Sequence, residues 1–587
     1  MEMEAKKKTI PYIDILFIVM LILYPFRHVS FGVDLMDGGY SYANFTYCGE
    51  EYMDSMWFFA TWLANVVGHF LGKLPFGNLM LGMNIYTTLF VSAMAVVGYY
   101  FFTKELGLPK WIVFVSEMVA VSLCWVPTAA LYNYLTYFLL LWGVILLYRG
   151  LVKEKNWCLI GAGICLGLNV GVRFSNLPQM GLVLAVWYYC IRKKVAWKET
   201  CKKTVLCILA YVGSFGLLFV IIGVLYGFGD YTEGIRRLFA MTEYATDYAA
   251  DSMLKTMVKG YTAIGYWFKR CVLAGGITLV ICGVFPKKCA LLKKIITAAV
   301  MLGLMWWCKD SGFYSLDSRS YYSVYYPYIL LFVAAMGIAV FNLCDKNVSE
   351  DKKLQAVIML ILILVTSLGS NNAILSTINN LFFILPCLGG LVHDFVVQKE
   401  HIIFWPFKAF LLIYLVFAIW QAGKYGYHYV YEEAAGAMDL SVEISKVPRL
   451  KGMYTGAEKA EELEALYEFL KESGLREKEC MLFGDIPGIS YYMELPPALN
   501  IWSDLRSYSP TTMERDMKEI EAQIESDGTY PIIIMHKKYE GYYQKGDESI
   551  LPEEKTIKMK LDYLCGFIEK YEYRSLYESG YFEVLGR

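Results

Sequence analysis

The stretch TVLCILAYVGSFGLLFVIIGVLYGF, residues 204–228, decides the class of this protein, because it contains no charged side chain. About 18 or more consecutive apolar residues are enough to cross the hydrocarbon core of a bilayer as a helix. Similar runs recur from Tyr12 to Ala422, and the whole chain is 57% hydrophobic and only 19% charged. Soluble domains carry about 25% charged residues. The sequence therefore predicts a polytopic α-helical membrane protein.

The apolar runs predict about thirteen transmembrane helices. Lysine and arginine gather in one set of loops, which includes Lys6–Lys8, Arg149 and Arg192–Lys194, and the positive-inside rule places this set in the cytoplasm. The first run lacks a small-residue cleavage site and is expected to be retained as an anchor. An odd number of spans leaves the C-terminal region outside the cell membrane. The predicted spans are 12–30, 79–103, 109–129, 131–149, 156–173, 177–191, 204–228, 271–286, 294–308, 327–344, 354–370, 374–398 and 402–422.

Two domains are expected: a transmembrane domain at 1–422, with a first external loop at 31–78, and an extracytoplasmic domain at 423–587. Within the loop, residues 55–74 have the pattern of a helix lying on the membrane surface. A second long external loop is expected at 229–270.

The extracytoplasmic domain is expected to be a small α/β domain. The segment TGAEKAEELEALYEFLKESG (455–474) predicts a helix with a Thr455–Glu458 capping box and a stop at Gly474. CMLFG (480–484) and PIIIMH (531–536) predict buried parallel strands. GDIPG (484–488) is interpreted as a strand-to-helix turn, with a ligand loop as the alternative.

The stretch FGVDLMDGGYSYANFTY (31–47) places two carboxylates directly after the first apolar run. Asp34 and Asp37 beside Gly38-Gly39 suit general-base chemistry at the outer membrane surface, because lost hydration raises the pKa of a carboxylate toward the working range. The glycines would allow a substrate to approach closely. A solvated Asp-Gly turn without chemistry is the alternative.

Other features narrow the function classes. The sequence contains no P-loop, so no ATP-driven pump is expected in this chain. The net charge of −1 gives no basic field for nucleic acid. Glu117 lies near the middle of the predicted 109–129 span, where an acid is costly and usually has a partner in the bundle. Its interpretation is a structural polar contact, with proton transport as the alternative.

The layout resembles the C-type glycosyltransferase superfamily (GT-C), and most closely its bacterial protein-mannosyltransferase and aminoarabinose-transferase branch. The matching motifs are MDGGYSYANF (36–45), LYNYLTYFLLLWGVILLYRGL (131–151), GSNNAILSTINNLFFILP (369–386) and MLFGDIPGISYYMELPPALNIWSDL (481–505). The acidic residue of the family's first loop maps onto Asp37, with Asp34 as the near alternative. Some members carry adjacent acidic residues here, whereas these two lie three apart.

The resemblance implies transfer of a sugar from a polyprenyl-phosphate donor to an extracytoplasmic glycan, lipid or protein acceptor, with inversion. Asp37 or Asp34 would be the catalytic base. The leaving lipid phosphate needs cations near the outer face, and the candidates are Arg173, Lys309, Arg319, Arg236 and Arg237. Interfacial or solvated charges are the alternative for each of these cations.

Tyr40 and Tyr321 are further candidates for contact with the substrate, with an aromatic belt as the alternative for Tyr321. A divalent metal is compatible with this chemistry, but no motif of metal ligands indicates one. Two other functions stay open on the sequence: a transporter or flippase for a lipid-linked or small polar substrate, and a non-catalytic membrane scaffold. The spans and Glu117 favour a transporter, whereas the missing inverted repeat and the large external domain oppose it.

Overall fold

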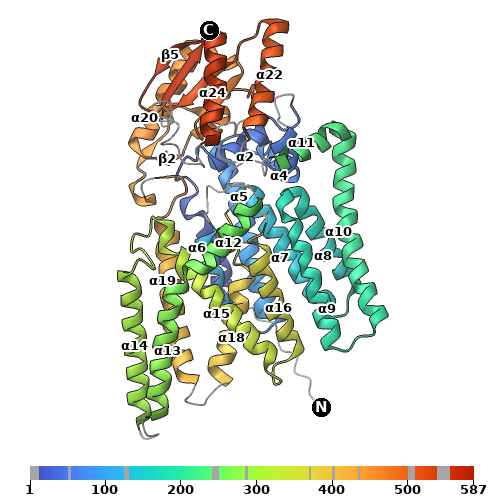
Figure 1. The fold of residues 1–587 in the computed structure, drawn as a ribbon, viewed down its shortest axis with the longest axis vertical. Coiled ribbons are helices and arrows are strands. Elements are labelled where there is room, and N and C mark those ends of the chain that lie inside the picture. The colour runs from blue at the N-terminus through green and yellow to red at the C-terminus, as the bar shows by residue number, and fades with distance from the viewer. Residues whose placement is uncertain are drawn as a thin grey trace.

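The computed structural model describes residues 12–50, 55–124, 131–240, 250–284, 289–368, 372–398, 404–433, 436–499, 509–537 and 555–587. Two parts follow one another along the long axis of the molecule (Figure 1). A bundle of long helices has the N-terminus at its lower end, and a smaller part with helices and strands carries the C-terminus at the top. The short helix α2 lies where the two parts meet.

Among the described residues, the helical part contains nineteen α-helices, several of them short. They are α1 (Tyr12–Leu23), α2 (Asp37–Thr46), α3 (Ser55–Ala60), α4 (Trp62–Gly72), α5 (Met80–Tyr100), α6 (Lys110–Leu123), α7 (Leu131–Val152), α8 (Asn156–Val172), α9 (Val183–Arg192), α10 (Trp197–Tyr226), α11 (Phe228–Ala240), α12 (Ala250–Ala263), α13 (Gly265–Val284), α14 (Ala290–Asp310), α15 (Tyr325–Cys344), α16 (Glu350–Val365), α17 (Ile374–Ile378), α18 (Ile384–Gln398) and α19 (Trp405–His428). The 3₁₀ segments η1 (Tyr24–His28), η3 (Phe174–Leu182) and η6 (Tyr321–Ser323) extend or join them.

Seven helices of the described residues are long and apolar enough to cross a membrane, so the protein is a multi-pass membrane protein. They are Met80–Glu105, Leu131–Val152, Trp197–Tyr226, Leu254–Ile281, Ala290–Asp310, Tyr321–Cys344 and Trp405–His428. The predicted number of about thirteen spans stays a prediction. Residues 254–270 differ from the prediction. The sequence predicts an external loop there, whereas in the structure these residues form a candidate membrane span together with most of α13.

Two predicted spans are interrupted in the structure. Residues 177–191 divide into η3 and α9, because Pro178 has no N–H for a regular helix and clashes with the preceding turn. Residues 374–398 divide into α17 and α18. The last helix, α19, continues six residues beyond the predicted end at residue 422, to His428. The final residues of the predicted 109–129 and 354–370 spans and the first of 402–422 lie outside the described residues.

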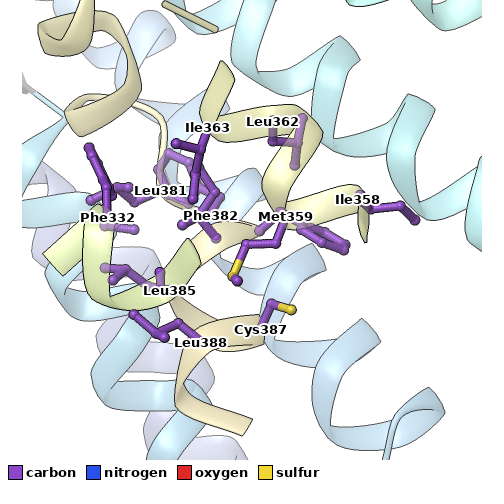
Figure 2. Close-up of a cluster of buried hydrophobic side chains, with 14 of the residues drawn as sticks. Phe332, Ile358, Met359, Leu362, Ile363, Leu381, Phe382, Leu385, Cys387 and Leu388 are labelled. Atoms are coloured by element: carbon purple, nitrogen blue, oxygen red, sulfur yellow. The ribbon is translucent and has the colours of Figure 1, made fainter. Parts of the chain in front are cut away.

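Apolar side chains from α15, α16, α18 and the segment just before α18 form part of the bundle core (Figure 2). Such packing resembles the interior of an organic crystal in density. The labelled residues are Phe332, Ile358, Met359, Leu362, Ile363, Leu381, Phe382, Leu385, Cys387 and Leu388.

The C-terminal part contains a four-stranded sheet in the order β3-β4-β6-β5. Strands β3 (Cys480–Phe483) and β4 (Ile532–His536) pair in parallel, with Cys480 opposite Ile532, as the sequence predicts. Strands β5 (Arg574–Glu578) and β6 (Phe582–Gly586) complete the sheet in antiparallel pairing. A separate pair joins β1 (Val442–Glu443) to β2 (Tyr454–Thr455).

Helices cover both faces of the four-stranded sheet. They are α20 (Ala457–Glu472), α21 (Gly488–Tyr492), α22 (Pro510–Asp527) and α24 (Lys555–Lys570). Cys480 and Leu482 of β3 join the apolar cluster of α20 and α2, whereas Met481 and Phe483 join that of α22 and α24. This alternation is the two-residue period of a strand buried on both sides. One face of the sheet is therefore continuous with the core under the first external loop.

Local sequence signals explain several element ends. Ser509 caps α22 by accepting the N–H of Thr512 at 3.1 Å, and Pro510 occupies the first helical position. Gly474, with a φ of 68°, follows the end of α20 as predicted. The predicted capping box is wrong, because Gly456 is the N-cap and the Thr455 hydroxyl donates to Glu433 instead.

Candidate active site

The acidic stretch forms a turn and helix α2 at the junction of the two parts (Figure 1). Asp34 is fully buried, and its two carboxylate oxygens accept the backbone N–H groups of Met36, at 2.8 Å, and Gly38. The first N–H groups of a helix have no partner within the helix, so these bonds stabilise the start of α2. Asp34 is therefore engaged as a capping residue through both oxygens.

Asp37 is the first residue of α2 and, unlike Asp34, is only half-buried. One carboxylate oxygen accepts the hydroxyl of Tyr431 at 2.6 Å. The other oxygen has no hydrogen-bond partner within the described part of the chain. It is thus the oxygen that can accept a proton from a bound molecule.

The two carboxylates influence each other's ionisation. Burial and the negative charge of Asp37 raise the pKa of Asp34 well above its ordinary value, although two backbone hydrogen bonds oppose this. Burial also raises the pKa of Asp37, but the hydroxyl of Tyr431 and the positive charge of Arg173 pull it down. Asp37 is therefore the more readily ionised carboxylate of the pair.

Arg173 lies at the end of α8, facing the same site. Its guanidinium carbon lies 5.3 Å from the ring centroid of Tyr132, and its charge acts on Asp37. A second arginine, Arg27 of η1, donates to the carbonyl of Tyr24 at 3.2 Å and makes no ion pair with any described carboxylate. A guanidinium group of this kind suits a phosphate group.

The segment that follows α19 holds the acidic turn in place. The carboxylate of Glu433 accepts the N–H of Val33 at 2.9 Å and the Thr455 hydroxyl at 2.7 Å. Lys459 pairs with Glu433 at 3.0 Å and donates to the carbonyl of Val33 at 3.2 Å. Both backbone groups of Val33 are thus bound by one ion pair of the C-terminal part.

The C-terminal part also contacts the turn through α21. The N–H of Gly488 donates to the carbonyl of Leu35 at 2.8 Å, and the Tyr492 hydroxyl donates to the carbonyl of Asp34. GDIPG is a strand-to-helix turn, as predicted, between β3 and α21. The interpretation of Gly39 as an opening for substrate is wrong, because Gly39 packs directly against the backbone of Gly488.

Aromatic rings lead from the end of α19 toward the carboxylates. Tyr425 and Tyr429 stack with centroids 4.5 Å apart, and Tyr321 meets Tyr425 edge-on at 6.0 Å. Tyr429 in turn lies within electrostatic reach of Asp34 and Asp37. The predicted residue Tyr321 is therefore linked to the carboxylates by a row of ring contacts through Tyr425 and Tyr429.

Other predicted residues lie elsewhere. Tyr40 is 3% exposed and packs in the apolar core beneath α2. Lys309 is exposed at the end of α14. Arg319 is exposed and pairs with Asp317 at 3.0 Å, on the loop before η6.

Arg236 and Arg237 of α11 belong to a network of ion pairs. Arg236 pairs with Glu233 at 2.9 Å. Arg237 faces Asp516 at 3.5 Å and Glu519 at 3.7 Å, both on α22. The structure therefore places Arg237 where α11 meets α22 of the C-terminal part.

Glu117 is fully buried on α6, and neither carboxyl oxygen has a hydrogen-bond partner among the described residues. Its carboxyl group lies against Gly98 of α5, where the missing side chain leaves room for it. The expected polar partner is therefore not found in the described part of the bundle.

Several residues of the site were missed from sequence. Tyr431, Glu433 and Tyr429 belong to the run YHYVYEE (427–433), directly after the last apolar run. An aromatic and acidic run at the outer end of a span is the signal that could have found them. Lys459 and Arg27 carry no comparable signal. Among the described residues no group of three or more His, Cys, Asp or Glu side chains is arranged to hold a metal ion.

Comparison with known proteins gives likeness only to solved structures, since no family model and no curated protein matches the chain. It is similar to the oligosaccharyltransferase AglB of Archaeoglobus fulgidus, in complex with an inhibitory peptide and a dolichol-phosphate, at 10% identity and a TM-score of 0.48, over 98% of this chain and 74% of that one. The apo form of the Archaeoglobus enzyme gives 10% identity and a TM-score of 0.49, over 94% and 72%.

The chain is also similar to ArnT of Cupriavidus metallidurans bound to undecaprenyl phosphate, at 10% identity and a TM-score of 0.39, over 98% of both chains.

Proposed function

We propose that this protein is an integral-membrane glycosyltransferase that moves a sugar from a polyprenyl-phosphate donor to an extracytoplasmic acceptor. The observation that carries the proposal is the state of Asp37 at the outer end of the bundle. Asp37 is half-buried, keeps one oxygen open and lies beside a cation. A positioned carboxylate of this kind suits a general base for an acceptor hydroxyl.

The roles of the two carboxylates differ. Asp34 is fully buried with both oxygens bound to backbone N–H groups, so it builds the turn. Asp37 takes the proton from the acceptor hydroxyl. The acceptor oxygen bonds to the anomeric carbon as the bond from that carbon to the phosphate oxygen breaks. Attack from the face opposite the phosphate inverts the configuration, and the lipid phosphate leaves as an anion.

The cations and rings fit the rest of the donor. Arg173 and Arg27 stabilise negative charge that develops on the leaving phosphate. Tyr429 is half-buried beside the carboxylates and stacks on the buried ring of Tyr425, so its open side is a surface on which a sugar ring can pack. Tyr321 extends this surface toward the bundle. The three groups therefore correspond to the base, the phosphate and the sugar of one reaction.

The proposed orientation puts the Lys-rich ends of the helices in the cytoplasm. Asp14, near the start of α1, pairs with Lys104 at 2.8 Å and Lys110 at 2.9 Å, and Arg192 pairs with Glu350 at 2.8 Å. These pairs belong to the end of the bundle opposite the C-terminal part (Figure 1). The positive-inside rule favours this end as cytoplasmic, which leaves α2 and the C-terminal part outside.

Replacing Arg173 with Gln tests the phosphate role. Because a hydrogen bond to a charged group contributes about 1.5–3 kcal/mol, the variant should bind polyprenyl phosphate roughly 10–100-fold more weakly. Lys309→Gln removes an exposed cation at the end of α14 and serves as the matched control, with unchanged affinity expected. The measurement is binding of undecaprenyl phosphate to purified full-length protein. Equal affinity in both variants would remove Arg173 from the proposed site.

Replacing Tyr431 with Phe tests the base. The hydroxyl of Tyr431 lowers the pKa of Asp37, so its loss should raise that pKa. More of Asp37 is then protonated at low pH, and the acidic limb of the pH–rate profile should move to higher pH. Activity at high pH should largely remain. Tyr427→Phe, on an exposed ring in the last turn of α19, is the control. A uniform loss at every pH would point to misfolding instead.

A further inference from the structure

A pocket of about 170 Å³ opens at the seam between the first external loop and the C-terminal part. We call it the seam pocket, and define it by Phe45 of α2, His69 and Lys73 of α4, Asn78, and Arg449 and Tyr491 of the C-terminal part. A single buried water needs only about 10–15 Å³ of such space. The seam pocket therefore has room for a small organic ligand.

The seam pocket is separate from the catalytic carboxylate. Asp37 begins α2, whereas Tyr42, which also lines the pocket, follows five residues later. Five residues of helix rotate the side chain by about 140° and advance it by about 7.5 Å. The pocket thus lies toward the opposite side of the same short helix.

The floor of the pocket is aromatic. Tyr42 and Tyr491 pack with ring centroids 5.4 Å apart, and both rings are 3% exposed. The Tyr491 hydroxyl donates to the carbonyl of Asn78 at 2.9 Å, and Arg449 donates to the same oxygen at 2.8 Å. These bonds fix the loop that follows α4, so the floor is rigid before any ligand binds.

The rim of the pocket is positive. The ammonium group of Lys73 makes neither an ion pair nor a hydrogen bond with the described residues. Glu494 pairs with both Arg449, at 3.0 Å, and Arg476. Two arginines therefore share one carboxylate at this seam, and Lys73 adds a positive charge that has no carboxylate partner among the described residues.

The rim also supplies neutral polar groups. His69 lies one helical turn before Lys73, on the same side of α4. One of its ring nitrogens bonds to the carbonyl of Phe45 at 2.9 Å. Since a carbonyl only accepts, that nitrogen carries the proton, and the other ring nitrogen of the neutral imidazole is an acceptor. The side-chain amide of Asn78 adds donor and acceptor groups.

We propose that the seam pocket binds a small organic anion that carries a phosphate or carboxylate group, held by Lys73 and by the polar rim above the tyrosine floor. The ligand would touch α2, α4 and the C-terminal part together. This site is additional to the catalytic carboxylates and does not depend on the proposed transfer reaction. It gives the protein a second point at which a soluble molecule or a substrate group is recognised.

Binding of glucose 6-phosphate to purified full-length protein, followed by ligand-observed NMR, tests the proposal. Lys73→Gln should weaken binding about tenfold or more, the contribution of a hydrogen bond to a charged group. Gly72→Leu should also abolish binding, because Gly72 lines the pocket and a leucine there fills it. Lys471→Gln changes an exposed lysine of α20 that lies outside the pocket, and should bind like the wild type.

Further ligands and one further variant, measured in the same binding experiment, distinguish the possible results. Inorganic phosphate that binds and depends on Lys73 supports the proposal and identifies the phosphate as the recognised group. Glucose that binds as tightly as glucose 6-phosphate overturns it, as does the absence of saturable binding. Arg173→Gln should leave binding unchanged. If Arg173→Gln abolishes binding while Lys73→Gln retains it, the ligand occupies the catalytic site and the seam pocket proposal fails, while the proposed function stands.

Discussion

Replacing Asp37 with Asn should reduce sugar transfer by about 10²–10⁴-fold, the usual loss when a positioned general base is removed. The amide keeps the shape of the carboxylate and can still accept the hydroxyl of Tyr431, so the variant should insert, fold and bind the lipid donor. The measurement is glycan transfer in membranes containing the variant, normalised to the amount of protein. Binding of polyprenyl phosphate should stay within a few-fold of the wild type.

Asp34→Asn is the matched comparison. An asparagine offers one acceptor oxygen where Asp34 offers two, so one of the N–H groups of Met36 and Gly38 would face an NH₂ group. Loss of a cap costs about 0.5–2 kcal/mol, and the variant should show lower abundance with partial activity. If Asp34→Asn is inactive at normal abundance and Asp37→Asn transfers at the wild-type rate, Asp34 is the base. If both remain active, the acidic turn is not catalytic, and a transporter or scaffold becomes the better interpretation.

Replacing Gly39 with Ala should separate the C-terminal part from the first external loop. The new Cβ atom would lie 2.8 Å from the nitrogen of Gly488 and 3.0 Å from the carbonyl oxygen of Asp34, and both are backbone atoms. Backbone cannot turn away as the end of a side chain can, so one of the two helices must shift. Overpacking of this kind costs about 1–3 kcal/mol, occasionally more. Activity and resistance to proteolysis at the junction should both fall.

Gly566→Ala provides the control for this change. Gly566 belongs to α24, and a methyl group there meets nothing within 4 Å. Alanine is favoured over glycine inside a helix by roughly 0.5–1 kcal/mol, so this variant should be as stable as the wild type or slightly more so. Thermal unfolding and limited proteolysis of the purified proteins give the comparison. A Gly39→Ala protein with wild-type stability would show that α2 and α21 need not touch.

Features that depend on neighbouring residues were predictable from the sequence. Long apolar runs predicted the helices of the bundle. The short apolar runs 480–484 and 531–536 predicted a pair of parallel strands, which the structure contains. For these elements the physical signal, hydrophobicity, lies within a single stretch of chain. Asp37 was singled out differently, through the resemblance of its motif MDGGYS to the glycosyltransferase superfamily, because the local residues also fit a solvated turn.

Features that depend on distant contacts were not predictable. Tyr431 meets Asp37 across 394 residues, and Glu433 meets Val33 across 400. The local pattern predicted that Thr455 caps the following helix, but the Thr455 hydroxyl donates a hydrogen bond to Glu433 instead. The role of Gly39 could not be inferred either, because the packing partner that requires a glycine belongs to another part of the chain.

The bond between Tyr492 and the carbonyl of Asp34 joins residues 458 apart. A ribosome that adds roughly 5–20 residues per second therefore needs roughly 20–90 s between these two positions. During that time the acidic turn lacks the contacts that Glu433, Lys459 and Tyr492 make with Val33 and Asp34. A chain that stops early would be inserted in the membrane yet inert. The order of synthesis thus delays chemistry until the whole molecule has been made.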